Sequence, residues 1–207
     1  MQRIITFILL IISIKAYNQT SDTVEQKLKQ ITSIEQLNEL RESYVDWQID
    51  VVEANLNESK FDSTFMSLEK GEVKTVKEIV GTFTYKVMEV SNVKEFRVSH
   101  IYLNGNELSM TEIDSLRKMI IEKHNKGFPF SSLSKQYASY KKPNNGDLGW
   151  FKENAMVDDF ENAVKKHEKG DIFIVDIPDK GWYYVVLKTF DDRESRILKM
   201  IRVKCNN

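Results

Sequence analysis

The sequence predicts an α+β fold in which helices pack against a mostly antiparallel sheet. Several segments carry apolar residues three and four positions apart, which is typical of amphipathic helices. Other segments alternate apolar and polar residues or run apolar for six to eight positions, as strands do. The chain has 207 residues, of which 41% are hydrophobic and 11% aromatic, so it can form a packed core. We therefore expect a globular protein with one large domain or two small ones.

Residues 1–16 predict a secretory signal peptide. Arg3 gives a basic start, residues 4–14 are almost wholly apolar, and Ala16 is a small residue at a plausible cleavage point. A membrane-spanning helix needs roughly 20 apolar residues. The run here is shorter, which favours a cleaved signal over an uncleaved anchor. We therefore expect an exported mature protein with no stable membrane insertion after cleavage.

Charge and cysteine content exclude several functions. The chain has 30 Lys and Arg against 31 Asp and Glu, and removal of Arg3 and Lys15 with the signal would leave a net charge of about −3. This charge gives no attraction to nucleic acid. The single cysteine, Cys205, excludes an intrachain disulfide.

The three histidines do not have the spacing of metal ligands. They are His100, His124 and His167. His124 and His167 stand near predicted helix ends among lysines and glutamates, so we interpret both as solvated surface residues. We expect neither a metal nor a cofactor.

The first part of the mature chain predicts one or two helices followed by two strands. Residues 22–53 are charged and helix-prone, with apolar positions at Leu28, Ile31, Ile34, Leu37 and Leu40. Residues 79–90 alternate apolar and polar side chains, and residues 96–103 continue in the same manner. The two strands are expected to join at Ser91-Asn92.

A longer helix is predicted next, between Ser109 and Gly127. Asp114 stands three residues after Thr111 as a variant of the capping box, and Gly127 marks the end of the helix. A second, short helix fits residues 131–138. A polar loop, residues 141–145, contains a proline and leads into the next motif.

The most informative motif is the glycine-rich hexapeptide of residues 146–151, which combines two glycines, an acid and paired aromatics. We predict that it forms a shaped loop beside a pocket. A third helix follows over residues 158–166. Three more strands are expected, at residues 172–177, 182–189 and 196–203.

The sequence also predicts an internal duplication. When the chain is shifted by 99 residues without a gap, Glu69-Lys70-Gly71 falls on Glu168-Lys169-Gly170, and Tyr85 falls on Tyr184. The first copy then lacks its opening strand, and residues 196–203 form a spare strand at the end of the chain. We hypothesise that this tail strand completes the N-terminal module, which would be a truncated second copy.

These observations predict four segments. They are the signal peptide at 1–16, a helical and β module at 17–93, a second domain at 94–192, and a C-terminal strand and tail at 193–207.

The second domain resembles the parvulin family of peptidyl-prolyl cis-trans isomerases. The resemblance covers residues 97–189 and rests on motifs that occur in this order: Val98-Ser99-His100-Ile101, Gly127-x-x-Phe130-x-x-Leu133, Gly146 to Phe151, Met156, Phe160-Glu161-x-Ala163, Lys169-Gly170 and Gly181-Trp182. Each motif alone is weak, and their order makes the resemblance specific. It implies a four-stranded antiparallel sheet flanked by helices. Together with the signal peptide and the second parvulin-like segment, it makes the chain similar to exported bacterial foldases that pair such domains with chaperone-like modules.

The resemblance also implies site residues. Leu148, Met156 and Phe160 occupy the positions of the family's proline-binding slot, and all three are apolar here. His100 occupies the position of the family's first-strand histidine. Taken without the resemblance, the three apolar residues would be ordinary core residues.

The polar half of the site departs from the family. Tyr183 stands where the family has its second histidine, and Lys180 precedes it at a serine-like position. The position usually held by cysteine or aspartate falls on Ser139 or Tyr140. A tyrosine hydroxyl both donates and accepts, so Tyr183 can offer it to the His100 ring. We therefore expect weak isomerase activity, with His100, Tyr183 and Ser139 as catalytic residues.

The expected partners are unfolded or partly folded exported proteins with X-Pro segments. Residues 103–107 lack the basic cluster found in phosphate-directed members of the family, so no preference for phosphoserine is expected. One alternative is a non-catalytic chaperone or peptide-binding module on a parvulin scaffold. Another is that the N-terminal helices dimerise the protein through the apolar stripe between Leu28 and Leu40.

Overall fold

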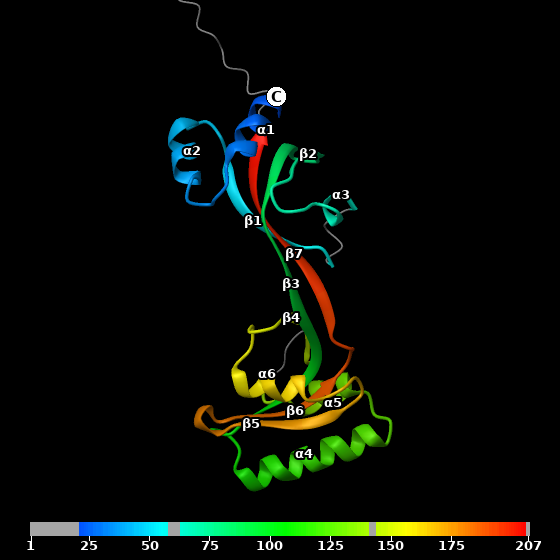
Figure 1. The fold of residues 1–207 in the computed structure, drawn as a ribbon. Coiled ribbons are helices and arrows are strands. Elements are labelled where there is room, and N and C mark those ends of the chain that lie inside the picture. Colours follow the sequence, from blue (N-terminus) through cyan, green and yellow to red (C-terminus); the bar gives the residue numbers. More distant parts are fainter. Residues whose placement is uncertain (1–20, 58–62, 141–143, 206–207) are drawn as a thin grey trace, which may run out of the picture. The chain divides into compact units, whose positions relative to one another are not determined.

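The computed structural model describes residues 21–57, 63–140 and 144–205. The predicted signal peptide lies outside these residues. Among the described residues, no helix has the length and apolar character needed to cross a membrane. The chain divides into two compact units (Figure 1). Unit 1 comprises the described residues within Met1–Ala54, Lys60–Val90 and Leu198–Asn207, and unit 2 those within Asn55–Ser59 and Ser91–Ile197.

The strands form a seven-stranded sheet, whereas the resemblance implied four strands. They are β1 Ile49–Asn55, β2 Val73–Glu78, β3 Gly81–Asn104, β4 Asp147–Lys152, β5 Ile172–Ile177, β6 Trp182–Lys188 and β7 Arg193–Cys205. The order is β1-β7-β3-β6-β5, and β2 and β4 also pair with β3. The β2–β3, β3–β4, β3–β6 and β5–β6 pairs are antiparallel. The number of strands exceeds four because β3 and β7 have residues in both units. The strands of both units therefore belong to one sheet.

The helices agree with the periodicity of the sequence. They are α1 Ser21–Gln30, α2 Leu37–Ser43, α3 Ser63–Met66, α4 Met110–Asn125, α5 Phe130–Tyr137 and α6 Asp158–Lys165, with a 3-10 turn, η1, at Pro178–Lys180. One or two helices were predicted for residues 22–53; the structure has two, α1 and α2, and β1 takes the end of that segment. α4 lies between Ser109 and Gly127 as predicted, and α5 and α6 lie within one residue of the predicted bounds.

Three local predictions are wrong. Residues 91 and 92 do not separate two strands, because β3 continues through them as one strand of 24 residues. The capping box of α4 is formed by Ser109 and Glu112 rather than by Thr111 and Asp114. The hexapeptide is mostly strand, because β4 pairs with β3 from Asp147 onward.

Unit 1 has a core built from α1, α2 and the strands beneath them. Its buried members are Val24, Leu28, Ile31, Leu37, Leu40, Trp47, Ile49, Met88, Ile201 and Val203. Four of the five apolar positions that predicted helical structure here are in this cluster, and the fifth, Ile34, packs against it. Ile201 and Val203 belong to β7, so the end of the chain supplies part of the core of unit 1.

Unit 2 is layered, with α6 over one face of the β5–β6 hairpin and α4 under the other (Figure 1). The face below α6 holds Phe96, Val98, Phe151, Phe160, Val164, Phe173, Val175, Ile177 and Val186. The opposite face holds Ile101, Leu103, Ile113, Ile120, Phe130, Leu133 and Val185. Successive side chains of a strand point to opposite faces, which is why neighbours on β3 and β6 enter different clusters.

The internal duplication stays a prediction. The alignment by a shift of 99 residues without a gap does not match the pairing in the β2–β3 and β5–β6 hairpins. Val73 pairs with Lys86 between β2 and β3. Ile172, at the shifted position of Val73, pairs with Leu187, which is two residues beyond the position that the shift assigns to Lys86. The β5–β6 turn is longer because it contains η1.

Candidate functional site

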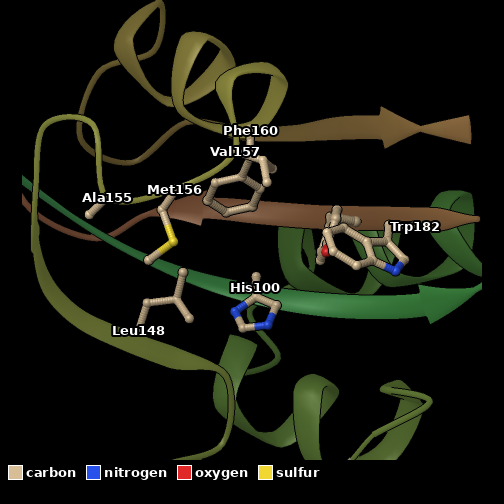
Figure 2. A pocket seen from close by; sticks show the side chains of 8 residues that line it. His100, Leu148, Ala155, Met156, Val157, Phe160 and Trp182 are labelled. Atoms are coloured by element: carbon tan, nitrogen blue, oxygen red, sulfur yellow. The ribbon is translucent and has the colours of Figure 1, made fainter. Parts of the chain in front are cut away.

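A pocket of about 270 Å³ opens on the α6 face of unit 2. Its wall is mainly apolar and consists of His100, Leu148, Ala155, Met156, Val157, Phe160, Trp182 and Tyr184. Figure 2 shows the side chains of Leu148, Met156 and Phe160 converging on the space beside the His100 ring. The structure thus brings together four of the six residues predicted for the site.

Each wall residue is positioned by a different element. Leu148 lies at the start of β4, and Met156 lies in the segment between β4 and α6. Phe160 is in the first turn of α6, where its ring meets the Tyr184 ring edge-on at 5.4 Å between centroids. Tyr184 and Trp182 lie two residues apart on β6, so both face the pocket.

His100 is held by the backbone of the hexapeptide. The residue is 8% exposed, and its backbone N–H donates to the Gly146 carbonyl oxygen at 2.9 Å. Ring atom Nδ1 lies 3.0 Å from the same oxygen. Because a carbonyl oxygen can only accept, Nδ1 carries the proton of this bond. The ring is therefore fixed in orientation at the pocket wall.

Gly146 is required for this arrangement. Its φ is 89°, a left-handed conformation that favours glycine. A Cβ built at this position would collide with the His100 carbonyl oxygen and with Ser134 Oγ. The glycine therefore lets β4 approach β3 closely enough to hold the histidine.

Asp147 anchors the start of β4. Arg97 Nη2 donates to Asp147 Oδ2 at 2.6 Å, and the Gly149 N–H donates to Oδ1 at 2.9 Å. The hydrogen bond from Arg97 is the largest of the effects that hold the pKa of Asp147 below its ordinary value. The ionised carboxylate thus fixes the backbone on both sides of Leu148.

Glu161 holds the segment that carries Met156. Its carboxylate accepts from the Asn154 N–H at 2.9 Å, from the Met156 N–H at 3.4 Å and from Lys165 Nζ at 2.8 Å. Burial would raise the pKa of Glu161, but these hydrogen bonds outweigh burial and the pKa is lowered. Glu161 is therefore a positioning residue for the pocket.

We expect the Met156 segment to loosen in acid. The pKa of Glu161 is lowered below its ordinary value of 4.5, so its stabilising effect is complete above pH 4.5 and is lost as the pH falls through the lower, folded value. The backbone amide NMR signals of Asn154 and Met156 should shift in this range. In Glu161→Gln, which cannot ionise, both signals should stay constant there. An equal pH response in the variant would contradict the assignment.

Tyr183 does not reach His100, so the predicted hydroxyl contact is wrong. Its ring packs on the opposite face of the sheet, where the Arg117 guanidinium lies 5.3 Å from the ring centroid. Tyr184 takes the place beside His100, with 5.8 Å between ring centroids. Burial, and next the proximity of Tyr102, raise the pKa of Tyr184 to about 12, so its hydroxyl stays neutral near pH 7.

Replacement of each tyrosine by leucine should show which of the two rings lies beside His100. Tyr184→Leu removes a ring next to His100 and is expected to shift the His100 ring signals in NMR spectra. Tyr183→Leu removes a ring from the other face and should leave these signals in place. A response of His100 to Tyr183→Leu alone would show that the faces are exchanged.

Ser139, Tyr140 and Lys180 are not part of the pocket wall. Ser139 Oγ accepts from the Asn104 N–H at 3.0 Å, and the Ser139 N–H donates to the Tyr102 carbonyl oxygen. Ser139 thus ties its loop to β3. Tyr140 is exposed, and Lys180 Nζ lies over the Trp182 ring at 4.7 Å.

Sequence reasoning missed four wall residues, which are Ala155, Val157, Trp182 and Tyr184. The alternation of β6 could have identified Tyr184, because it shares a face with Trp182 and Val186. In the described residues, no group of three or more His, Cys, Asp or Glu side chains could hold a metal ion.

The fold and the pocket define a class: an α+β domain with a small, mainly apolar pocket beside a buried histidine. Comparison with known proteins identifies the family. Residues 85–191, just over half of the chain, match the family described as PPIC-type PPIASE domain, which is the peptidyl-prolyl isomerase domain. The chain belongs to this family.

The chain is also similar to individual proteins. It is 34% identical over 104 residues to the foldase protein PrsA of Geobacillus sp. (strain WCH70), which covers 49% of this chain and 34% of that protein. It is 30% identical over 123 residues to foldase protein PrsA 1 of Bacillus cereus, covering 58% of this chain and 39% of that protein. The match thus spans only about a third of the length of these relatives.

Solved structures show matches of similar extent. The crystal structure of PrsA from Bacillus subtilis matches with 28% identity and a TM-score of 0.38, over 47% of this chain and 35% of that one. A crystal structure of a PpiC-type peptidyl-prolyl cis-trans isomerase domain matches with 22% identity and a TM-score of 0.43, over 49% of this chain and 93% of that one.

Proposed function

We propose that this protein is a peptidyl-prolyl cis-trans isomerase that acts on X-Pro bonds of exported proteins and assists their folding. The observation that carries the proposal is the convergence of Leu148, Met156 and Phe160 on one open pocket beside His100. Membership of the PPIC-type family supports the reaction. The foldase names of the relatives and the predicted signal peptide support exported clients.

The reaction explains why such a pocket is useful. Rotation about a peptide bond has a barrier of roughly 18–20 kcal/mol, and uncatalysed X-Pro isomerisation takes tens to hundreds of seconds. No bond is made or broken, so a catalyst need only bind the twisted amide more tightly than the planar one. The twisted amide has a less polar carbonyl group and a more basic nitrogen.

In this mechanism the apolar wall holds the pyrrolidine ring while the rest of the substrate rotates. Leu148, Met156 and Phe160 exclude water from the ring. A dry environment favours the less polar, twisted amide over the planar one. His100 is a polar member of the same wall, and its bond to Gly146 fixes its orientation. In this proposal Tyr184, rather than Tyr183, is the tyrosine that lies beside His100.

A second candidate is a peptide-binding chaperone without isomerase activity. One observation favours it: among the residues that the structure describes, the pocket wall has no carboxylate or thiol, and its polar side chains are those of His100, Trp182 and Tyr184. An apolar pocket of this kind can bind a proline ring without lowering the rotation barrier. The two candidates share a binding site and differ in turnover.

A proline-limited assay distinguishes the candidates. The full chain is added to a proline-containing peptide, and exchange between its cis and trans forms is measured by NMR. An exchange rate that rises in proportion to protein concentration supports the isomerase. Peptide binding at the pocket without faster exchange supports the chaperone, and no binding overturns both.

A further inference from the structure

Unit 1 contains a second pocket, of about 380 Å³. It is lined by Ile31, Thr32, Lys70, Gly71, Lys86, Val87 and Met88. The wall combines residues that directly follow α1, residues in the turn before β2 and residues on β3. Because all of these residues belong to unit 1, the pocket is complete within that unit. It contains none of the residues assigned to isomerisation.

Lys86 is the unusual member of this wall. The residue is only 5% exposed, and its Nζ donates to the Lys29 carbonyl oxygen at 3.1 Å. A lysine ammonium has three donors, and this bond uses one. Among the residues that the structure describes, no carboxylate lies within ion-pair distance of this ammonium. Burial lowers the pKa of Lys86, as expected for an ammonium without a counter-charge.

Unit 2 contains a buried lysine that has an acidic partner. Lys188 is 2% exposed, and its Nζ donates to the Val164 carbonyl oxygen at 3.0 Å, much as Lys86 does to Lys29. In addition, Asp192 Oδ1 lies 2.6 Å from Lys188 Nζ. Each buried lysine thus binds a backbone carbonyl, but only Lys188 has an acidic partner among the described residues.

A buried ammonium without a counter-charge is costly, by several kcal/mol in typical proteins. Such groups are usually paired or bound to a ligand. Lys70, on the rim of the same pocket, adds a second positive charge. Ile31 and Met88, which lie in one apolar cluster, supply apolar contacts. The wall therefore offers positive charge and apolar surface together.

We propose that this pocket binds a carboxylate carried on a small apolar group, with the Lys86 ammonium as its charge partner. Two sources have this chemistry. One is a free aliphatic carboxylic acid, and the other is the C-terminal carboxylate of a peptide with an apolar last residue. The site is independent of the proposed isomerase activity.

Hexanoate is a suitable probe, and hexanol is its uncharged match. In a titration of the full chain followed by NMR, hexanoate should shift the side-chain signals of Lys86 and the amide signals of Val87 and Met88. Hexanol should bind at least about tenfold more weakly, because it cannot form a charge-assisted hydrogen bond. Equal binding of hexanol and hexanoate would overturn the proposal, as would absence of binding by hexanoate and by the peptides below.

Lys86→Met tests the charge itself. It keeps the length of the side chain and removes an uncompensated buried charge, so unit 1 should stay folded. Binding of hexanoate should fall about tenfold or more. Lys77→Met, on the exposed face of β2, is the matched control and should bind as the unmodified chain does. Undiminished hexanoate binding in Lys86→Met would overturn the proposal.

Peptides identify the source of the carboxylate. A short peptide ending in leucine is compared with the same peptide carrying a C-terminal amide. Preference for the free carboxylate at the Lys86 signals assigns the pocket to chain ends. Binding of hexanoate alone assigns it to free carboxylic acids, and either result supports the carboxylate site.

Discussion

Replacing Met156 by alanine is expected to lower kcat/KM for X-Pro isomerisation about tenfold while the fold persists. Met156 packs against the cluster below α6 and forms one wall of the pocket beside His100. Complete burial of a methionine side chain contributes about 1.5–3 kcal/mol, and Met156 is only partly buried by the protein itself. The rest of its surface is available to a pyrrolidine ring. Its truncation removes contact with the substrate and adds water to the site.

The matched control is Met110→Ala. Met110 is the first residue of α4 and is 46% exposed, so its truncation should leave both activity and stability unchanged. Isomerisation of a proline peptide by each variant gives kcat and KM separately. A loss in kcat would show that the wall binds the twisted amide better than the planar one, and a rise in KM alone would show equal binding of both. Unchanged kinetics in Met156→Ala would remove the pocket from the mechanism.

Replacing Glu95 by alanine is expected to lower the free energy of unfolding of unit 2 by about 3 kcal/mol. Glu95 is 2% exposed, and its carboxylate is the shared acceptor of three side chains. Asn55 Nδ2 donates to Oε1 at 2.5 Å, while Arg193 Nε and Ser195 Oγ donate to Oε2 at 2.8 and 2.5 Å. Removal of the carboxylate leaves these donors without their acceptor. Arg193 is partly exposed and can turn to water, which limits the loss.

Glu95→Gln should lie between the alanine variant and the unmodified chain, because the amide oxygen can still accept one or two of these bonds. Glu89→Ala is the matched control, since Glu89 is an exposed glutamate on the same strand. Urea unfolding followed by the amide signals of unit 2 gives the free energies. Equal stability of the Glu95 and Glu89 variants would show that the buried network contributes nothing.

Much of the pocket could be predicted from the sequence. Leu148, Met156 and Phe160 were grouped with His100 because their motifs occur in one order along the chain. The structure places all four in one wall. The polar half could not be predicted in the same way. The position of Tyr184 opposite Tyr102 is set by the register between β3 and β6, two strands that are about 80 residues apart in the sequence.

Other features depend on residues far apart in the sequence. Nothing near Glu95 indicates that it is a buried acceptor, because its partners Asn55 and Arg193 are 40 and 98 positions away. Likewise, Ser91-Asn92 resembles a turn when considered alone. Both residues lie in the long β3 strand, whose partner β7 comes from the other end of the chain. Local pattern could not reveal that pairing.

The continuity of β3 through residues 91 and 92 limits which length changes the chain can accept there. Successive side chains of a strand point to opposite faces, so insertion of one residue near Ser91 would exchange inward and outward positions on one side of the insertion. The strand would then need a bulge to restore the alternation. An insertion of two residues keeps the parity. Length changes in homologous strands should accordingly occur in even steps or together with a bulge.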